Sequence, residues 1–396
     1  MLPDNIKKGN MFGLIIGLVI LIGWGVHEFW DHKRNRGKIP EIIHINGTRG
    51  KSSVTRLIAA GLRAGNYQVI AKTTGSAPRI IYPSGREKPI VRLFGANIRE
   101  QLKIIKFASK SNVDYLVLEC MAVTPEYQWT TEHKMVKSTI GVITNSRPDH
   151  LDVMGPGLRN VTLSMCNTIP DNGLILTSEN KVFPLMKKVA DSRHTEFEYV
   201  SKEDITEEDM QGFSWIEHRD NLALSLEVCR RCGVDREIAL KGMYDSTPDI
   251  GATEIFKYKV NGKELFFAHS FAANDPESTF VLMEYIHKIH PEIPSVAIVL
   301  NTRADRMFRS KQLADMLSNH KFDGLFLIGD QELTIHNYAT GHGIPAEKIF
   351  PLGWSKGDDL VKEICILDAE KILVFGIGNI GGNGGPIVDY FKERSS

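Results

Sequence analysis

The sequence contains little cysteine and no excess of charge of either sign. Its five cysteines are spread over 396 residues, which excludes the dense disulfide framework of a small secreted protein and favours a reducing compartment. Lys and Arg together number 48, as do Asp and Glu, so no overall field draws the chain to nucleic acid and any anion site must be local. Repeats and low-complexity tracts are absent too. A chain of this length with 42% hydrophobic residues is expected to form two globular domains and a further segment.

The one C-x-x-C spacing, between Cys229 and Cys232, lacks what a metal site needs. No second cysteine pair and no histidine cluster lies near it in the sequence, so zinc or redox chemistry is the weaker interpretation. The stronger interpretation places both thiols on a helix that runs from about Asp220 to Cys232.

A single long apolar run lies close to the N-terminus. Residues 11–26 are all uncharged, and Trp24, Phe29 and Trp30 gather at the end of this run, as aromatic residues do at a membrane interface. We predict a membrane helix over Met11–Phe29. A cleaved signal peptide is the alternative, disfavoured because bulky Trp30 and charged residues follow in place of small ones. The basic residues that set the orientation are Lys7 and Lys8 before the helix, and Lys33, Arg34, Arg36 and Lys38 after it. Their excess after the helix predicts a cytoplasmic body.

Short apolar strands alternate with helical stretches through the rest of the chain, a pattern typical of α/β domains with mainly parallel sheets. The strands expected first are Glu41–Asn46, Gln68–Thr73, Asp114–Glu119 and Thr139–Asn145. A second set follows a hairpin over Ile255–His269 that turns at Asn261-Gly262: Val296–Leu300, Gly324–Ile328 and Lys371–Phe375. The stretch 247–251 has the composition of a hinge. We therefore predict an anchor with a basic linker at 1–37 and α/β domains at 38–248 and 249–396.

The sharpest local signal is Gly47-Thr48-Arg49-Gly50-Lys51-Ser52, between a predicted strand and the amphipathic stretch Ser52–Ala64. In such a phosphate loop, glycines turn backbone N–H groups towards phosphate oxygens, Lys51 reaches the terminal phosphates and Ser52 can bind magnesium. Ile45 departs from the general pattern, which has a glycine there. The alternative is a glycine turn with a solvated lysine.

Two acidic positions follow predicted strands of the same sheet. Glu119 ends one strand, and Asp149-His150 and Asp152 come after another. Because the carboxyl ends of parallel strands collect ligands at one edge of a sheet, these residues are candidates to bind Mg²⁺. Taken singly, each carboxylate is equally well explained as a helix cap or a surface charge. With a phosphate loop they predict metal-assisted phosphoryl transfer from ATP.

These motifs resemble those of the Mur ligases and folylpolyglutamate synthases. Their loop reads G-T-x-G-K-S/T without the earlier glycine, which accounts for Ile45, and Asn145–Asp152 is similar to their N-x-x-x-D-H-x-D segment. The resemblance implies catalytic roles for Lys51, Glu119 and His150 and a metal site of Ser52, Glu119 and His150. It also implies nucleotide binding by Gly47, Thr48, Arg49, Gly50, Lys51, Ser52, Ser53, Asn221, Asp275, Arg303, Asp305 and Arg306. The chain departs from this family in two places. Many Mur ligases have a carbamoylated lysine that helps to hold a second magnesium ion, but this chain has no lysine between Asp152 and Lys181. Glu217 stands where the asparagine helix of the Mur ligases usually begins with histidine.

A closer resemblance covers essentially the whole chain, to the ligase subunits of poly-γ-glutamate synthases (CapB/PgsB). The matching segments are 45–52, 119–123, 149–156, 271–275, 303–306 and 376–381. This resemblance implies an α/β fold with an N-terminal transmembrane helix, a central Mur ligase-like P-loop ATPase domain with a mainly parallel sheet, and a C-terminal Rossmann-like α/β domain. It implies ATP and Mg²⁺ as cofactors, and glutamate and a poly-γ-glutamate chain as substrates. The implied partners are small integral-membrane subunits like CapC/PgsC and CapA/PgsA, not nucleic acid.

The expected activity is ATP-dependent amide ligation through an acyl phosphate, joining glutamates by their γ-carboxyls at the cytoplasmic face of the membrane. Candidates to hold substrate carboxylates are Arg49, Lys72, Arg79, Arg303 and Arg306, each of which is otherwise a solvated surface residue. Three alternatives stay open: an ATPase that powers polymer export, a nucleotide-gated scaffold without catalysis, and a related ligase with a folate or peptide acceptor. Gly376–Gly381 resembles a dinucleotide fingerprint, but it lies too near the chain's end for the strand and acidic residue that such a site needs.

Overall fold

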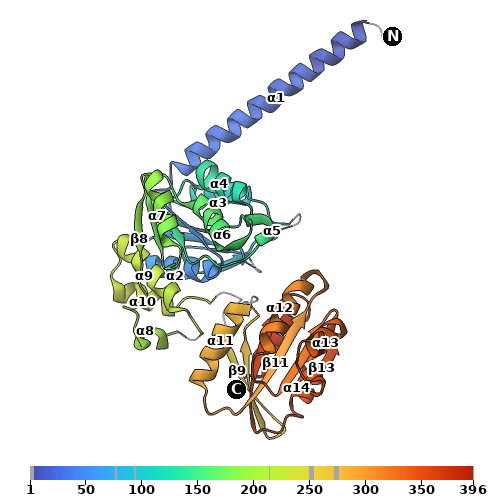
Figure 1. Ribbon diagram of the computed structural model, residues 1–396. Coiled ribbons are helices and arrows are strands. Elements are labelled where there is room, and N and C mark those ends of the chain that lie inside the picture. Colours follow the sequence, from blue (N-terminus) through green and yellow to red (C-terminus); the bar gives the residue numbers. More distant parts are fainter. Residues whose placement is uncertain are drawn as a thin grey trace. The chain divides into compact units, whose positions relative to one another are not determined.

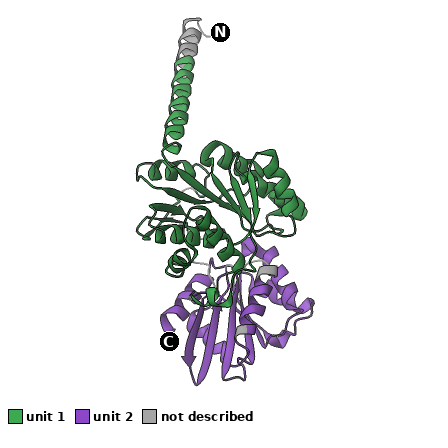
Figure 2. Cartoon of the chain, turned by 90° about the vertical axis from the view of Figure 1, so that its left-hand side faces the viewer, with its two compact units in different colours: residues 1–212, 218–247 green, residues 213–217, 248–396 purple. Residues whose placement is uncertain are grey.

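The chain folds into two compact units, which Figure 2 distinguishes by colour. The computed structural model describes residues 4–75, 78–92, 95–213, 215–248, 254–271 and 276–395. Unit 1 comprises Met1–Gly212 and His218–Thr247, and unit 2 comprises Phe213–Glu217 and Pro248–Ser396. The predicted hinge coincides with the change of unit after Thr247, although its residues 249–251 lie outside the described residues, as does Asp275.

A single N-terminal helix, α1 (Asp4–Arg36), extends from unit 1 (Figure 1). Its stretch Leu14–Arg36 is long and apolar enough to cross a membrane, and none of that apolar surface is buried. The predicted basic linker after this helix is wrong, because the helix continues through the basic residues. Their positive charges in its last turn suit the negative end of the helix dipole, and Arg36 donates hydrogen bonds to the carbonyls of Val136 and Lys137 at 2.8 and 2.7 Å.

Unit 1 is built on an eight-stranded sheet in the order β4-β3-β2-β5-β1-β6-β7-β8. Its strands are β1 Glu41–Asn46, β2 Val69–Lys72, β3 Arg79–Ile81, β4 Glu87–Pro89, β5 Tyr115–Glu119, β6 Ile140–Ile143, β7 Leu174–Thr177 and β8 Glu196–Tyr199. Only the pairs β2–β3 and β3–β4 are antiparallel among these strands, so the prediction of a mainly parallel sheet is confirmed. The apolar strands β1, β2, β5 and β6 are buried because helices cover both faces.

The helices of unit 1 after α1 cover this sheet (Figure 1). They are α2 Lys51–Ala64, α3 Glu100–Ala108, α4 Pro125–Thr130, the π-helix η1 Thr131–Val136, α5 Leu151–Met154, α6 Gly157–Met165, the 3₁₀ turn η2 Cys166–Thr168, α7 Phe183–Ser192, α8 Glu207–Gln211, α9 Arg219–Arg231 and α10 Arg236–Tyr244. Helix α2 packs tightly against α9 and α10. A Cβ at Gly61 would lie 2.6 Å from Cys229 Sγ, and one at Gly242 would lie 2.4 Å from Ala64 Cβ, so both glycines permit close helix approach.

Unit 2 contains a six-stranded sheet in the order β13-β12-β11-β14-β10-β9. Its strands are β9 Ile255–Val260, β10 Lys263–His269, β11 Ser295–Thr302, β12 Gly324–Gly329, β13 Ile349–Gly353 and β14 Lys371–Gly378. The predicted hairpin is confirmed: β9 and β10 are antiparallel, and Asn261 and Gly262 at their turn have φ of 51° and 79°, as a two-residue turn of this kind requires. The other pairs in this sheet are parallel.

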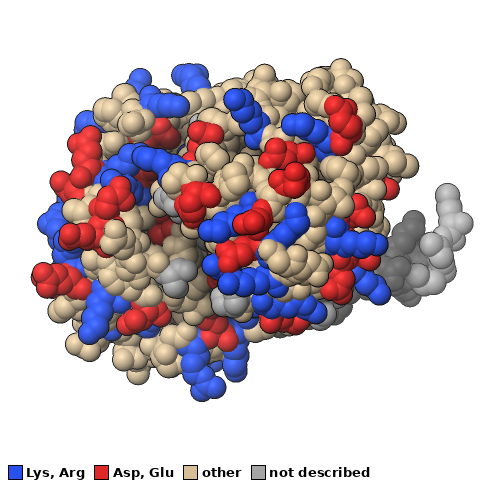
Figure 3. Space-filling view, turned by 90° about the horizontal axis from the view of Figure 1, so that it is seen from below, with Lys and Arg blue, Asp and Glu red and all other residues tan. Residues whose placement is uncertain are grey.

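Helices lie on both faces of the unit 2 sheet and enclose two apolar cores. They are α11 Pro276–Ile289, η3 Ala304–Arg306, α12 Met307–Leu317, α13 Glu332–Gly341, η4 Ala346–Lys348, α14 Gly357–Ile364 and α15 Gly384–Arg394. One core includes Leu300, Leu313 and Phe375, and the other includes Phe267, Phe326 and Phe391. On the face drawn in Figure 3, basic and acidic side chains are interspersed, in keeping with the balanced composition.

Candidate active site

The phosphate loop lies between β1 and α2, at the centre of the unit 1 sheet. Gly47 has φ of 138°, and a Cβ there would lie 2.0 Å from Thr144 Oγ1. Gly50 has φ of 78°, and a Cβ there would lie 2.5 Å from Asn221 Oδ1. Both positions therefore require glycine for conformation and for space. The contact at Gly50 also places Asn221, on α9, directly against the loop.

The loop is braced by the segment that follows β6. The backbone N–H of Thr48 donates to the Asn145 carbonyl at 3.1 Å, and that of Arg49 donates to Asn145 Oδ1 at 3.1 Å. Asn145 Nδ2 in turn donates to the Arg49 carbonyl at 3.1 Å. These bonds fix the first half of the loop and account for the asparagine at the head of the segment 145–152.

Lys51 lies at the start of α2 with its ammonium folded over the loop. Its Nζ donates to the Gly47 carbonyl at 2.7 Å and to the Thr48 carbonyl at 3.3 Å. Burial lowers the pKa of Lys51, and the nearby negative charge of Glu119 opposes that change. Lys51 is partly buried, and a cation partly shielded from water attracts a polyanion more strongly than a solvated one does.

Ser52 and Glu119 lie side by side beneath the loop. Ser52 Oγ donates to Glu119 Oε2 at 2.9 Å, and the Thr74 N–H donates to the same oxygen at 2.6 Å. Glu119 is 2% exposed and ends β5, next to β1. A hydroxyl and a carboxylate are hard oxygen donors of the kind that Mg²⁺ and Mn²⁺ prefer, so these side chains fit a divalent cation on a bound nucleotide.

Asp149 and His150 lie at the same pocket, on the segment after β6. His150 has φ of 48° and precedes α5, its side chain is 41% exposed, and its Nε2 lies 3.9 Å from Asp149 Oδ2. Asp149 also pairs with Arg49 at 3.4 Å. Within the residues that the structure describes, no group of three or more His, Cys, Asp and Glu side chains is close enough to hold a metal ion. Of the three predicted metal ligands, Ser52 and Glu119 are joined by a hydrogen bond, and His150 lines the same pocket as Glu119.

A pocket of about 190 Å³ connects these groups. It is lined by Asn46, Gly47, Thr48, Arg49, Lys51, Thr74, Gly75, Glu119, Cys120, Met121, Ala122, Val123, Asp149, His150, Met154 and Met165. The loop, the end of β5 and the segment after β6 thus contribute to one pocket, as the strand order β5-β1-β6 requires. Ser52 and Ser53, in the first turn of α2, are not among the lining residues, and Ser52 reaches the pocket through its hydrogen bond to Glu119.

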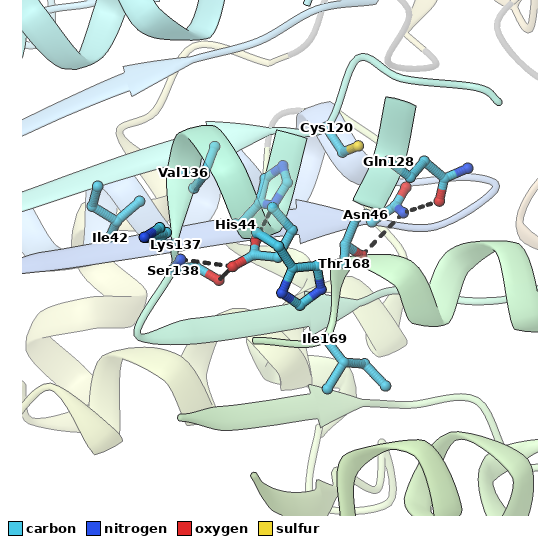
Figure 4. Close-up of polar contacts among 12 residues, drawn as sticks. Ile42, His44, Asn46, Cys120, Gln128, Val136, Lys137, Ser138, Thr168 and Ile169 are labelled. Carbon is cyan, nitrogen blue, oxygen red and sulfur yellow. Dashed lines mark hydrogen bonds and ion pairs between the residues drawn. The ribbon is translucent and has the colours of Figure 1, made fainter. Parts of the chain in front are cut away.

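A buried polar network supports the loop from below, and the sequence pattern gave no sign of it (Figure 4). Asn46 Nδ2 donates to Gln128 Oε1 at 3.0 Å and to Thr168 Oγ1 at 3.1 Å, while the Gly47 N–H donates to Asn46 Oδ1 at 2.8 Å. Gln128 is fully buried on α4. The amide of Asn46 therefore ties the first residue of the loop to the helical layer.

Two residues before Asn46, the imidazole of His44 lies against Glu132 of the π-helix. His44 Nδ1 is 2.7 Å from Glu132 Oε2, and both side chains are 1% exposed or less. The N–H and hydroxyl of Ser138 donate to the other carboxylate oxygen at 2.7 and 2.9 Å. Burial by itself lowers the pKa of His44, but contacts with Cys120 and Glu132 outweigh burial and raise it to about 10. The short contact with Glu132 and the raised pKa therefore favour the imidazolium form of His44, which lies on β1, the strand that leads into the loop.

Lys72 is not available to hold a substrate carboxylate, so that prediction is wrong. Its side chain is fully buried, and its ammonium pairs with Glu100 of α3 at 2.8 Å and donates to Gln101 Oε1 at 3.2 Å. The counter-charge arrives from a helix almost 30 residues later in the sequence, so the lysine alone gave no indication of it. Arg79 begins β3, where its N–H donates to Thr73 Oγ1.

The cysteines of the C-x-x-C spacing lie at the C-terminal end of helix α9, close to the helix bounds predicted for them. Cys229 is buried on α9, its thiol lies 3.8 Å from the Ile58 carbonyl, and burial raises its pKa. Cys232 follows the helix, and burial raises its pKa to about 11. A buried thiol with a raised pKa is a poor nucleophile and a poor metal ligand.

The predicted residues of unit 2 form a cluster of their own where β11 ends. Arg303 donates to both carboxylate oxygens of Asp305 at 2.9 Å and to Asn379 Oδ1 at 3.4 Å. Arg306 Nε lies 3.9 Å from Asp305. The segment after β14 meets them there, because Asn301 Nδ2 donates to the Gly381 carbonyl at 2.8 Å. The cluster is partly exposed at the carboxyl edge of the sheet, where ligands of α/β domains bind.

Comparisons with known proteins cover both units. Residues 45–244 match the Mur ligase middle domain, and residues 255–394 match the poly-gamma-glutamate synthase CapB C-terminal domain. The capsule biosynthesis protein CapB of Bacillus anthracis is 36% identical over 96% of this chain and 83% of its own length. The PGA synthase CapB of Bacillus subtilis (strain 168) is 34% identical over 97% of this chain and 98% of its own length.

Solved structures share the fold at low sequence identity. Folylpolyglutamate synthase of Mycobacterium tuberculosis, complexed with ADP, superposes with a TM-score of 0.67 at 14% identity, over 94% of this chain and 95% of that one. FolC of E. coli, in complex with DHPP and ADP, gives 0.66 at 12% identity over 93% of each chain. The bifunctional synthase of Yersinia pestis, complexed with AMPPNP and Mn ion, gives 0.66 at 13% identity over 91% of this chain and 92% of that one. The two-domain α/β architecture is therefore that of the Mur ligases and folylpolyglutamate synthases.

Proposed function

Since this chain belongs to the CapB family of poly-γ-glutamate synthases and is thus an ATP-dependent ligase that acts on glutamate, we propose that the pocket under its phosphate loop activates a glutamate γ-carboxylate. The observation that carries the proposal is the pair of Ser52 and Glu119, 2.9 Å apart, beside the Lys51 ammonium. A hydroxyl, a carboxylate and a partly buried cation at one loop are the groups that phosphoryl transfer from a metal-bound nucleotide needs.

The reaction proceeds in two steps. An oxygen of the chain's terminal γ-carboxylate attacks the γ-phosphorus of ATP, ADP leaves, and an acyl phosphate remains. The amino nitrogen of the next glutamate then attacks the acyl carbon, phosphate leaves with the bonding electrons, and the nitrogen loses a proton to give the amide. Activation is necessary because a carboxylate is a poor acylating agent towards an amine in water.

Residues of the pocket stabilise the charge that develops. Lys51 neutralises oxygens of the transferred phosphoryl group, and backbone N–H groups of the loop bind the rest of the triphosphate. Magnesium held by Ser52, Glu119 and His150 would supply further neutralisation of that charge. Arg49, which lines the pocket beside Asp149, binds the substrate carboxylate through its planar guanidinium. Asn221, against Gly50, belongs to the nucleotide site.

Residues of unit 2 are proposed to bind nucleotide or substrate as well. Arg303, Asp305 and Arg306 contribute to nucleotide or substrate binding from the carboxyl edge of their sheet. The same role is proposed for Asp275 on the sequence resemblance alone. The partly exposed guanidiniums of Arg303 and Arg306 are suited to the carboxylates of an anionic polymer.

We further propose that α1 anchors the enzyme in the cell membrane with its body in the cytoplasm. Its apolar stretch suits a single span, and basic residues end the helix on the side of the folded units. The partners there are the small integral-membrane subunits of a poly-γ-glutamate synthase, which would receive the growing chain.

The test uses membranes that contain the full chain and these small subunits, supplied with ATP, magnesium and labelled glutamate. Wild-type membranes should form labelled polymer and release phosphate only when glutamate is present. Lys51→Ala should abolish both, because loss of the cradling charge costs several kcal/mol of transition-state stabilisation, or roughly a thousandfold in rate. Lys187→Ala, which removes an exposed lysine of α7 that pairs with Asp191, is the control.

Two outcomes would contradict the proposal. Polymer formation at the wild-type rate by Lys51→Ala would show that the phosphate loop takes no part in the reaction. Phosphate release by the wild type that neither needs glutamate nor yields amide would favour an export ATPase.

A further inference from the structure

A cluster of charged and amide side chains lies behind the residues that line the pocket, between β2 and the N-terminal turn of α3. Lys72, which is fully buried, bonds to Glu100 at 2.8 Å, to Gln101 Oε1 at 3.2 Å and to the sulfur of Met121 at 3.6 Å. Gln101 is fully buried too. Met121 lines the pocket, so the Lys72 ammonium is one side chain away from it without being open to it.

This cluster donates hydrogen bonds to the backbone carbonyls of two active-site residues, Glu119 and Thr74. Gln101 Nε2 donates to the Glu119 carbonyl at 3.1 Å. Arg92 binds both oxygens of Glu100 at 2.9 and 3.0 Å, and its other nitrogen lies 3.4 Å from the Thr74 carbonyl. The Thr74 N–H, in turn, is the 2.6 Å donor to the Glu119 carboxylate. Glu119 is therefore fixed at its carbonyl by Gln101 and at its carboxylate by a segment that Arg92 and Glu100 hold in place.

Stability alone does not explain why a lysine is buried at this position. Burying an ammonium costs several kcal/mol that its ion pair only roughly offsets, and an apolar side chain of similar size is often as stable or more so. Burial accordingly lowers the pKa of Lys72, against the charge and hydrogen bond of Glu100. Groups that orient a metal ligand typically change metal affinity by 10–100-fold when they are removed.

We propose that Lys72 and Gln101 are positioning residues that act on the reaction through Glu119 and Thr74. Lys72 orients Gln101 and Glu100, Gln101 fixes the end of β5, and Arg92 with Glu100 fixes Thr74. Neither Lys72 nor Gln101 touches substrate. The proposal rests on the proposed function in that Glu119 is taken as a ligand of the nucleotide's divalent cation.

The same helix connects this cluster to the membrane anchor. On its other side, Lys106 pairs with Asp31 at 2.8 Å, and Ser109 Oγ donates to Asn35 Oδ1 at 3.2 Å, both on α1. Arg99, directly before α3, pairs with Glu28 of α1 at 2.5 Å. One short helix thus contacts the anchor on one side and orients the metal-binding carboxylate on the other, so docking of the anchor contributes to the geometry of Glu119.

The test measures cation binding apart from turnover. The affinity of the detergent-solubilised full chain for Mn²⁺ with AMPPNP is measured by electron paramagnetic resonance, together with the melting temperature, for wild type, Lys72→Met, Gln101→Leu and the conservative Lys72→Arg. We expect Kd for Mn²⁺ to rise about tenfold or more in the first two variants and to recover in part in Lys72→Arg. Asn35→Ala with Asp31→Ala should raise it by a smaller factor.

Thr195→Val is the matched control for general loss of stability, because it removes a buried hydrogen bond to the Pro170 carbonyl on the far side of unit 1. It should lower the melting temperature without a change in Mn²⁺ affinity. If Lys72→Met and Gln101→Leu lower the melting temperature as Thr195→Val does and leave Mn²⁺ affinity at the wild-type value, the two residues are only structural and the proposal is overturned. If Lys72→Met does not fold, Gln101→Leu decides the question. A wild type that binds Mn²⁺-AMPPNP but forms no glutamyl amide would refute the proposed function and leave this inference standing.

Discussion

The ion pair between His44 and Glu132 should stabilise unit 1 in a pH-dependent way, and Glu132→Gln tests it. The substitution keeps the volume of the side chain and removes its charge, so His44 loses the partner that lies 2.7 Å away. The pKa of His44 is about 10 in the folded chain against an ordinary value of 6.5. A group whose pKa is raised by folding contributes its full stability below the unfolded pKa and loses it as pH rises through the folded pKa.

The size of the effect follows from these values. At about pH 7.5, His44 is protonated in the folded state and mostly neutral in the unfolded state. Each pH unit between that condition and its folded pKa is worth about 1.4 kcal/mol, so its contacts with Glu132 and Cys120 together contribute roughly 3 kcal/mol. The cost of removing one partner from a buried pair is similar, about 3–5 kcal/mol. For a unit of this size we expect a melting temperature roughly 6–12 °C lower.

The assay is scanning calorimetry of the detergent-solubilised full chain between about pH 6 and pH 10. The control is Glu126→Gln, which neutralises an exposed carboxylate of α4 and should change stability by less than about 0.5 kcal/mol. The gap between wild type and Glu132→Gln should narrow as pH rises towards 10. A variant as stable as wild type near neutrality, or a gap that widens with pH, would refute the assignment of a buried imidazolium.

Three further outcomes are expected. Gly47→Ala should lose ATP binding in a fluorescent-nucleotide titration, because its Cβ would lie 2.0 Å from Thr144 Oγ1 and the backbone there disfavours any side chain; binding within twofold of wild type would mean that the loop adopts another conformation. Ser52→Ala should raise the magnesium concentration needed for half-maximal ATP turnover by roughly tenfold, and an unchanged requirement would remove Ser52 from the metal site. Cys232→Ala should leave ATP turnover unchanged before and after treatment with a zinc chelator, whereas loss of activity on chelation would restore the metal interpretation of the C-x-x-C spacing.

The sequence predicted those parts of the fold that carry strong local patterns. β1 was predicted at its observed bounds, and the β9–β10 hairpin followed from Asn261-Gly262 between two apolar runs. The strands β3, β4, β7, β8 and β13 were not predicted. Of these, β3 and β4 are three residues each at the edge of the sheet, and β4 reads Glu-Lys-Pro, so neither contains the apolar run that identifies a buried strand. The strand β7 does read Leu-Ile-Leu-Thr, but so short a run does not distinguish a strand from a buried helix segment.

In the candidate site, too, the residues that stand in local motifs were predicted and the residues that support them were not. Lys51, Ser52 and Glu119 belong to motifs whose spacing fixes their position at a strand end, and the structure brings them together. The polar groups behind them come from helices far away in the chain: Gln128 from α4 for Asn46, and Gln101 from α3 for Glu119. Neither glutamine stands in a motif, and no motif singled out the π-helix residues that include Glu132. Such contacts depend on tertiary packing, which residue patterns do not encode locally.

In the proposed membrane-anchored enzyme, the uninterrupted passage of α1 into unit 1 would determine how the catalytic body moves relative to the bilayer. Its 33 residues measure about 50 Å along the axis, whereas a hydrocarbon layer takes up only about 30 Å. The remaining turns form a stiff stalk, clamped at its base by Arg36 and by the helix beside it. A catalytic body carried on such a stalk would not swing as it would on a flexible tether, so every round of elongation would take place at the same height above the lipid.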